Sequence, residues 1–206
     1  MKNFGDIMFT DTVKAEQARR GSREGYARMT ARPAPDGLGE REAAFIAARD
    51  SFYMASVTET GWPYVQHRGG PAGFLRVLSP TQLGFADYRG NRQYVSTGNF
   101  KTEDRASLFL MDYPNKARLK ILARVRGQSA DEAPELAARL HVEGEGRVER
   151  VFTLEVEAFD WNCPQFITPR FTAEQVRELI APQIEQLAAE NEGLKARLAM
   201  LEGKQD

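Results

Sequence analysis

Between residues 51 and 158 the chain consists of short runs of strand-forming residues, each ended by a turn signal. The segment Glu59-Thr60-Gly61-Trp62-Pro63 separates the first two runs and is typical of a hairpin turn. Strands are expected at 52–58, 64–68, 74–78, 82–86, 106–111, 119–125 and 147–158. Several short strands at this close spacing favour a barrel or a sandwich over a parallel sheet with crossover helices.

Helices are expected before this β region and between its last two strands. The residues around Thr10 offer N-cap oxygens ahead of a run of helix formers that ends at Gly21. The expected helices lie at 13–20, 22–29, 40–49 and 131–142, with a turn-rich connector at 31–37. The sequence thus predicts a mainly β fold with helices (α+β), divided into an N-terminal helical segment (1–40), a β domain (41–170) and a C-terminal helix (171–206).

The C-terminal segment carries a heptad repeat. Thr172 and Gln175 form a capping box, and Pro182 either kinks the helix or starts a new one. Ile180, Leu187, Leu194 and Leu201 fall on d positions, and Ile184, Asn191 and Leu198 fall on a positions. An Ile/Leu seam with one Asn favours a parallel two-stranded coiled coil, and hence a homodimer. The alternative is an amphipathic helix packed on its own barrel.

Charge and composition exclude several classes of protein. A formal net charge of −1 gives no general attraction to nucleic acid or to an anionic membrane. A basic-zipper DNA-binding protein needs a continuous basic helix ahead of the coil, whereas the stretch before the heptad here, Glu174–Leu179, is not basic and is followed by Pro182. No apolar run reaches the roughly 20 residues that span a bilayer, and the N-terminus has no apolar segment like that of a secretory signal. With one cysteine, Cys163, and two histidines, a disulfide framework is excluded and a zinc site is disfavoured. A cytoplasmic protein is expected.

Two cationic clusters stand out in the β region. The first runs from Tyr64 to Pro71 and places Gln66, His67 and Arg68 before a Gly-Gly turn. The second runs from Ala86 to Tyr94 and places cations on both sides of Gly90. Arginine binds phosphate in a bidentate manner, and an adjacent glycine lets the backbone approach. The two clusters together predict a phosphate site, the alternative being charged loops exposed to solvent.

This combination resembles the FMN-binding split-barrel family of pyridoxamine 5'-phosphate oxidase, over about residues 45–170. The resemblance implies a split β-barrel with FMN as its cofactor. Arg68 matches the strand arginine that binds the FMN phosphate; Arg92 replaces a family lysine and Asn91 a family arginine. The cofactor-binding residues that the resemblance implies, with their neighbours in the two clusters, are Gln66, His67, Arg68, Phe85, Ala86, Asn91, Arg92, Asn99, Arg118, Trp161 and Arg170.

Three of these positions concern the flavin ring. Arg118 stands near a family glutamine, and a cation beside the N1–C2=O edge of the ring would raise the flavin's reduction potential. The alternative is a salt-bridged surface arginine. Trp161 and Arg170 fit a tryptophan and an arginine that reach the flavin across the dimer interface in this family. His67 either donates a hydrogen bond to the cofactor or is simply packed.

The substrate side departs from the family pattern. The oxidases that act on pyridoxamine phosphate carry an Arg-x-His group before the final arginine, and Phe166 and Thr168 stand at those positions here. Oxidation of vitamin B6 by the usual mechanism is therefore not expected. The run from Trp161 to Gln165 suggests a different pocket wall. Cys163 lies within it and has no neighbouring acid–base pair in the sequence.

The main hypothesis is an FMN-dependent oxidoreductase that acts on a small molecule, with NADH or NADPH as candidate electron donor. No catalytic acid or base is identified, which agrees with hydride transfer by the cofactor itself. One alternative is a non-catalytic flavin-binding sensor or carrier. Another is a split barrel that binds haem or a deazaflavin.

Overall fold

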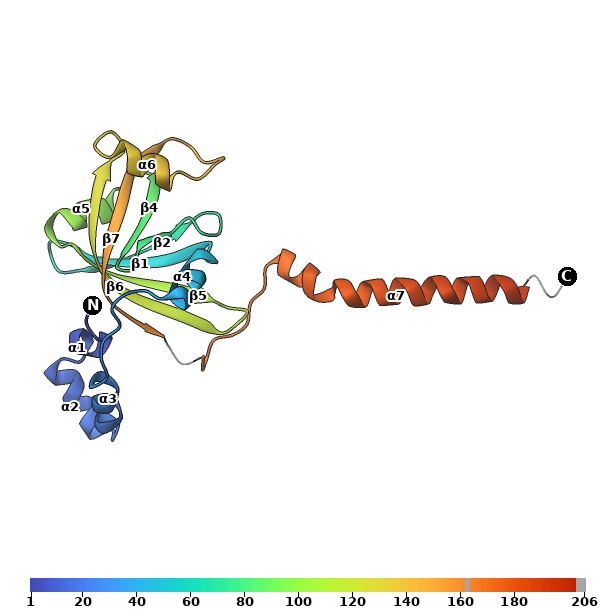
Figure 1. Ribbon diagram of the computed structural model, residues 1–206, viewed down its shortest axis with the longest axis horizontal. Coiled ribbons are helices and arrows are strands. Elements are labelled where there is room, and N and C mark those ends of the chain that lie inside the picture. Colours follow the sequence, from blue (N-terminus) through green and yellow to red (C-terminus); the bar gives the residue numbers. More distant parts are fainter. Residues whose placement is uncertain (162–163, 203–206) are drawn as a thin grey trace. The chain divides into compact units, whose positions relative to one another are not determined.

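The computed structural model describes residues 1–161 and 164–202 (Figure 1). Two compact units make up the chain. The first contains Met1–Asp112 and Lys116–Gln165, and the second contains Tyr113–Asn115 and Phe166–Asp206. The N-terminal helices belong to the first unit, together with all the strands.

The first unit is built on an antiparallel sheet that has seven strands within the described residues. The order across the sheet is β2-β1-β5-β6-β7-β4-β3. The strands are β1 (Ser51–Val57), β2 (Pro63–Gly69), β3 (Arg76–Ser79), β4 (Gln82–Tyr88), β5 (Arg105–Asp112), β6 (Ala117–Ser129) and β7 (Val148–Trp161). Each corresponds to one expected strand, so the predicted mainly β fold with helices is confirmed, and the strand order is that of a split barrel.

Alternating burial along the strands separates a core face from an outer face. On β5, Leu108 and Leu110 are fully buried, whereas Phe109 between them is only half-buried. The core face also carries the stacked rings of Phe85 and Phe152, whose centroids are 5.2 Å apart. We call the opposite side of β2, β1, β5 and β6 the outer face. One cross-strand row on the outer face is formed by His67, Tyr53, Phe109 and Lys120.

Six helices in the described part of the first unit cover or connect the strands. They are α1 (Phe4–Met8), α2 (Asp11–Arg19), α3 (Arg23–Thr30), α4 (Glu40–Ala47), α5 (Val95–Thr102) and α6 (Pro134–Leu140). Thr10 caps α2, because its side chain accepts a hydrogen bond from the backbone N–H of Val13 (3.4 Å). The sequence did not indicate α5, which follows β4 and forms one wall of the site described below.

The two ends of the sheet order are joined by side chains. β3 pairs only with the first half of β4, at residues 82–84, within the described residues. Further along β4, Asp87 forms an ion pair with Arg68 of β2 (2.5 Å), which lies at the other end of the order. This ion pair therefore spans the split of the barrel.

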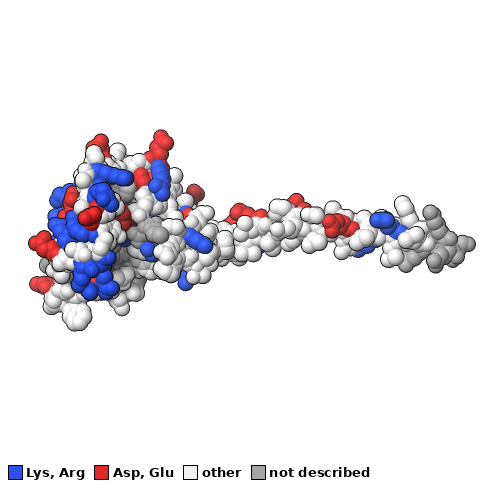
Figure 2. Space-filling view, turned by 90° about the horizontal axis from the view of Figure 1, so that it is seen from below, with Lys and Arg blue, Asp and Glu red and all other residues white. Residues whose placement is uncertain are grey.

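The second unit consists mainly of α7 (Ala173–Glu202). The capping box is confirmed: Thr172 N–H donates to Gln175 Oε1 (2.9 Å), and Gln175 N–H donates to Thr172 Oγ1 (3.2 Å). The helix continues through Pro182 as one element, so the proline does not start a new helix. Figure 2 shows α7 as a mostly uncharged surface, and the apolar a and d side chains are exposed in the single chain. In the described part of the chain, no helix combines the length and apolar character needed to cross a membrane.

Candidate functional site

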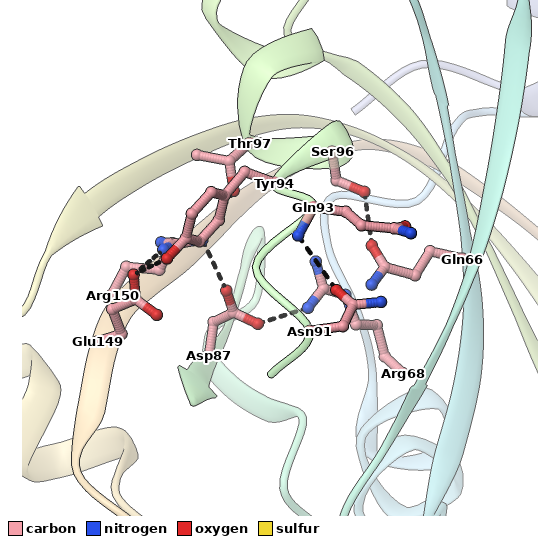
Figure 3. A network of polar contacts seen from close by, with 10 residues as sticks. All are labelled: Gln66, Arg68, Asp87, Asn91, Gln93, Tyr94, Ser96, Thr97, Glu149 and Arg150. Carbon is pink, nitrogen blue, oxygen red and sulfur yellow. Dashed lines mark hydrogen bonds and ion pairs between the residues drawn. The ribbon is translucent and has the colours of Figure 1, made fainter. Parts of the chain in front are cut away.

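A pocket of about 290 Å³ lies where β2, the end of β4, β7 and the start of α5 meet (Figure 3). Its walls are polar: three arginines, two carboxylates, three tyrosines and several amide and hydroxyl groups face the space. The lining residues are Tyr64, Gln66, Arg68, Asp87, Tyr88, Gly90, Asn91, Arg92, Gln93, Tyr94, Val95, Ser96, Thr97, Glu149 and Arg150. Both cationic clusters of the sequence contribute to it, as expected.

The loop between β4 and α5 adopts an unusual backbone conformation. Arg92 and Tyr94 both have positive φ angles, 61° and 55°, which are uncommon for residues with a side chain. Asn91 Oδ1 accepts a hydrogen bond from the backbone N–H of Gln93 (3.2 Å) and holds the turn between them. Strained conformations of this kind cluster at ligand sites. The sharp turn directs the N-terminus of α5 at the pocket, and no side chain caps that helix end.

Two buried arginines share one carboxylate in this pocket. Asp87 Oδ1 accepts from Arg68 Nη1 (2.5 Å), and Asp87 Oδ2 accepts from Arg150 Nη1 (3.1 Å). The three side chains are only 13–14% exposed. Asp87 and Arg150 lie directly opposite each other on β4 and β7, so the strand register itself brings them together.

Arg150 makes two further hydrogen bonds in the pocket. Its Nη1 also donates to Thr97 Oγ1 (2.9 Å), and its Nη2 donates to Glu149 Oε1 (2.5 Å). The Tyr94 hydroxyl donates to the same carboxylate (2.8 Å), and the Arg150 guanidinium lies 4.6 Å from the Tyr94 ring centre. The hydrogen bond from Tyr94, helped by Arg150, lowers the pKa of Glu149, which therefore stays ionised.

Two side-chain nitrogens in the described residues are buried without a hydrogen-bond partner: Nε of Arg68 and Nε of Arg118. Both belong to the expected cofactor-binding set. Buried donors of charged groups are rarely left unpaired, so each position is a candidate for an acceptor that the described residues do not supply. Arg68 lines the pocket, whereas Arg118 pairs with Met111 in the outer-face rows of β5 and β6. One chain therefore does not bring these two arginines together.

Gln66 and Phe85 support the pocket, and Ala86 lies behind it. Gln66 Oε1 accepts a hydrogen bond from Ser96 Oγ (2.8 Å), which ties β2 to the first turn of α5. The fully buried ring of Phe85 lies beneath Arg68, with its centre 5.5 Å from the guanidinium carbon. Ala86 is buried in a separate cluster with Leu140 of α6.

Two other expected residues point away from the pocket. His67 lies on the outer face, where its ring centre is 5.5 Å from that of Tyr53. Asn99 is buried on the inner side of α5, and its side-chain amide donates to Ser56 Oγ (2.9 Å). In this structure His67 packs against its neighbour strand, and Asn99 anchors α5 to β1.

Trp161 and Arg170, the positions expected to act across a dimer, are not among the lining residues of the pocket. The Trp161 indole N–H donates to Glu42 Oε1 (2.7 Å), and the ring packs against Arg41 and Phe45 of α4. Within the second unit, the guanidinium of Arg170 lies 4.8 Å from the ring centre of Tyr113. Of the expected pocket wall at 161–165, residues 162–163, which include Cys163, lie outside the described residues.

Sequence reasoning did not assign several residues that shape the site, namely Asp87, Tyr94, Ser96, Thr97, Glu149 and Arg150. Asp87 and Tyr94 lie inside the second cationic cluster, so their position in the sequence could have identified them as candidate site residues. Arg150 is 63 residues away from Asp87 in the sequence, and only the register of β4 and β7 reveals their pairing.

The sequence of the chain matches one family of known proteins. The profile of the pyridoxamine 5'-phosphate oxidase family matches residues 38–162, which is more than half of the chain. No curated protein matches it.

Several solved structures are similar to the chain. HupZ of Group A Streptococcus is 12% identical, with 65% of this chain and 99% of that chain covered and a TM-score of 0.48. A Lactobacillus delbrueckii protein whose name places it with the pyridoxamine 5'-phosphate oxidases is 21% identical (61% and 95% covered, TM-score 0.48). An FMN-binding protein of Syntrophomonas wolfei is 13% identical (72% and 97% covered, TM-score 0.44). Since the family profile spans all seven described strands and the whole pocket, the chain belongs to the pyridoxamine 5'-phosphate oxidase family as a divergent member.

Proposed function

We propose that this protein binds FMN, with the phosphoryl group in the pocket between β2, β4, β7 and α5, and that it is a flavin-dependent oxidoreductase acting on a small molecule. The observation that carries the proposal is the buried Nε of Arg68, which lacks an acceptor in the described residues and belongs to a pocket lined by two more arginines. A phosphate monoester supplies the missing acceptor.

The pocket fits the phosphoryl end of FMN. Arginine matches phosphate geometry, and the uncapped N-terminus of α5 adds backbone N–H donors and a positive dipole end. Arg92 is exposed at the rim, where its guanidinium adds positive charge. A volume of about 290 Å³ is at the lower end for ligand pockets, so it suits the phosphate and its attached chain rather than the whole cofactor.

The residues of the chain hold and orient the cofactor, and FMN, when bound, supplies the redox chemistry. Arg68 and the α5 terminus bind the phosphate, while Gln66 and Ser96 fix the spacing between β2 and α5. Among the described residues, no side chain that lines the pocket is assigned as a catalytic acid or base. Phe166 and Thr168 replace the substrate-binding pair of the B6 oxidases, so the substrate is a different small molecule, with NADH or NADPH as candidate electron donor.

A second copy of the chain is the proposed partner. The outer face exposes Tyr53, Val57 and Val65 by 42%, 38% and 61%, and it also carries the unpaired Nε of Arg118. Covering this face with a second barrel would bury the apolar side chains and bring Arg118 to the cofactor of the partner. In sedimentation experiments, Val65→Glu should dissociate the barrels. A Val65→Glu protein whose barrels remain paired would place the interface elsewhere.

The heptad of α7 supports the same partner. Ile184, Leu187 and Leu194 are 56–64% exposed in the single chain. Exposed apolar side chains at a and d positions are typical of a helix that pairs with another helix in a coiled coil. In a parallel pair, Glu190 would face Lys195 of the second copy. Within the single chain, these charges are engaged locally, Glu190 with Gln186 and Lys195 with Glu192. We also propose a cytoplasmic location, because the chain's single cysteine cannot form the internal disulfides that are common in small secreted domains.

The test is the absorption spectrum of the purified protein and the mass of the ligand released from it. A flavin spectrum, the mass of FMN and bleaching by NADH or NADPH are expected. A haem or deazaflavin spectrum would refute FMN as cofactor. If flavin binds but neither NADH nor NADPH reduces it, the protein is a flavin-binding sensor or carrier and not an oxidoreductase.

A matched pair of variants locates the site. Arg68→Met should weaken FMN binding by about 10- to 100-fold, since hydrogen bonds to charged groups are worth about 1.5–3 kcal/mol. Arg49→Met is the control, because Arg49 is equally buried (15% exposed against 14%) and is also paired with an aspartate, Asp112 (3.0 Å), but lies outside the pocket. Equal losses in both variants would mean that the phosphate is bound elsewhere.

A further inference from the structure

A carboxylate stands in the middle of a site that is proposed to bind an anion. Asp87 is 13% exposed, lines the pocket, and accepts from both Arg68 and Arg150 (Figure 3). A negative charge at this point repels a phosphoryl group. The family resemblance predicts cations around the phosphate and does not account for an acid among them.

The two arginines explain why a carboxylate lies between them. Two guanidinium groups with 14% and 13% exposure would repel each other, and each would lack part of its hydration. Removing one partner from a buried ion pair leaves an uncompensated charge and is strongly destabilising. Asp87 also connects β2 to β4 and β7 through these two contacts. It therefore stabilises the empty pocket.

The hydrogen bonds leave one arginine partly free for a ligand. Arg150 makes three hydrogen bonds to the chain, since its Nη1 donates to both Asp87 and Thr97 and its Nη2 to Glu149. Arg68 gives Asp87 only its Nη1, and its buried Nε has no acceptor in the described residues. A phosphoryl group would thus share Arg68 with Asp87.

We propose that Asp87 is an internal counter-ion of the pocket: it neutralises Arg68 and Arg150 when the site is empty and competes with a bound phosphate for Arg68. This inference rests on the proposed function, because it takes the pocket to be the phosphate site. The proposal predicts that Asp87 makes the affinity for phosphate lower than it would be with the three arginines alone. The rival role for Asp87 is pure positioning, in which it holds Arg68 in the orientation that binds best.

Asp87→Asn separates these two roles. Removing the charge should lower the melting temperature in buffer without phosphate and should raise the affinity for both inorganic phosphate and FMN by about tenfold, because like charges in a partly buried site repel strongly. The stabilisation by added phosphate should therefore be larger in the variant than in the wild type. An affinity that falls would overturn the competition and assign Asp87 to positioning.

Asp112→Asn is the matched control. Asp112 is also buried (10% exposed) and paired with an arginine, Arg49, but it lies outside the pocket. This variant should lose stability and keep the phosphate affinity of the wild type. An equal gain of affinity in Asp112→Asn would show that loosening the barrel, rather than removing the competitor, is responsible.

A second variant provides an alternative test if Asp87→Asn does not fold. The double variant Asp87→Asn/Arg150→Met removes one charge of each sign, so the net charge of the pocket is unchanged. Competition predicts that it binds phosphate at least as tightly as the wild type although it has lost an arginine. Weaker binding by tenfold would refute the counter-ion role. If wild-type protein binds phosphate but not FMN, the proposed cofactor fails while the comparison with inorganic phosphate still tests Asp87.

Discussion

The buried carboxylate of Glu42 joins the start of α4 to the end of β7. Its Oε2 accepts the backbone N–H of Gly39 (3.0 Å), and its Oε1 accepts the indole N–H of Trp161 (2.7 Å), with only 8% of the residue exposed. Glu42→Ala removes both hydrogen bonds and leaves two partly buried donors unpaired. We expect the free energy of unfolding to fall by about 3 kcal/mol, from about 1.5 kcal/mol for each bond to a charged acceptor.

Two companion variants calibrate this value. In Glu42→Gln, one amide oxygen can serve only one of the two donors, so a loss of about 1.5 kcal/mol is expected. Glu40→Ala changes an exposed acid in the same helical turn and should cost only the dipole contribution, about 0.3–1 kcal/mol.

Urea unfolding followed by tryptophan fluorescence measures the whole series. Trp62 is 74% exposed and should change little, so Trp161 provides the signal. The expected order of stability is wild type, Glu40→Ala, Glu42→Gln, Glu42→Ala. A Glu42→Ala protein within 0.5 kcal/mol of Glu40→Ala would refute the assignment of structural hydrogen bonds to this carboxylate.

Three further predictions concern the coil, the core and acid stability. Asn191→Leu should relax the dimer register and add higher oligomers in sedimentation; an unchanged strict dimer would show that the barrel alone sets the oligomer. Gly127→Ala should lower stability by about 1–3 kcal/mol in urea titrations, because its Cβ would lie 2.9 Å from the Phe152 ring, and an unaltered midpoint would contradict this packing. The hydrogen bond from Arg105 lowers the pKa of Glu103 from 4.5 to about 2, so its contribution is present above pH 4.5 and lost as the pH falls through about 2. Glu103→Gln should therefore lose less stability than the wild type between pH 4.5 and 2.

The strands could be predicted from the sequence because a strand with one buried face has apolar residues at every second position. Alternation of buried and exposed residues marks β5, and every expected strand corresponds to one that forms. The sequence of helix α5 shows no such regular pattern. Its sequence, VSTGNFKT, contains β-branched residues and a glycine, which are poor helix formers. Its position depends on long-range contacts such as the hydrogen bond from Asn99 to Ser56, two residues that lie 43 positions apart in the sequence.

The candidate site was predictable only where its residues are neighbours in the sequence. Arg68 beside its Gly-Gly turn, and Asn91 and Arg92 beside Gly90, form recognisable local clusters, and the pocket contains all three. Asp87 and Arg150 meet through strand pairing, which a single sequence does not reveal. For the same reason, the sequence does not indicate that Arg118 and Arg68 belong to opposite faces of the sheet.

The ion pair across the split of the barrel has a consequence for local opening. Between β2 and the second half of β4, the described residues provide a side-chain link in place of a ladder of backbone hydrogen bonds. Amide hydrogens that face such a gap exchange after local openings, which cost far less than global unfolding. Hydrogen exchange should therefore be faster along the free edge of β2 than in the doubly paired β6. An anion bound at Arg68 would then be detected as slower exchange at residues that never touch it.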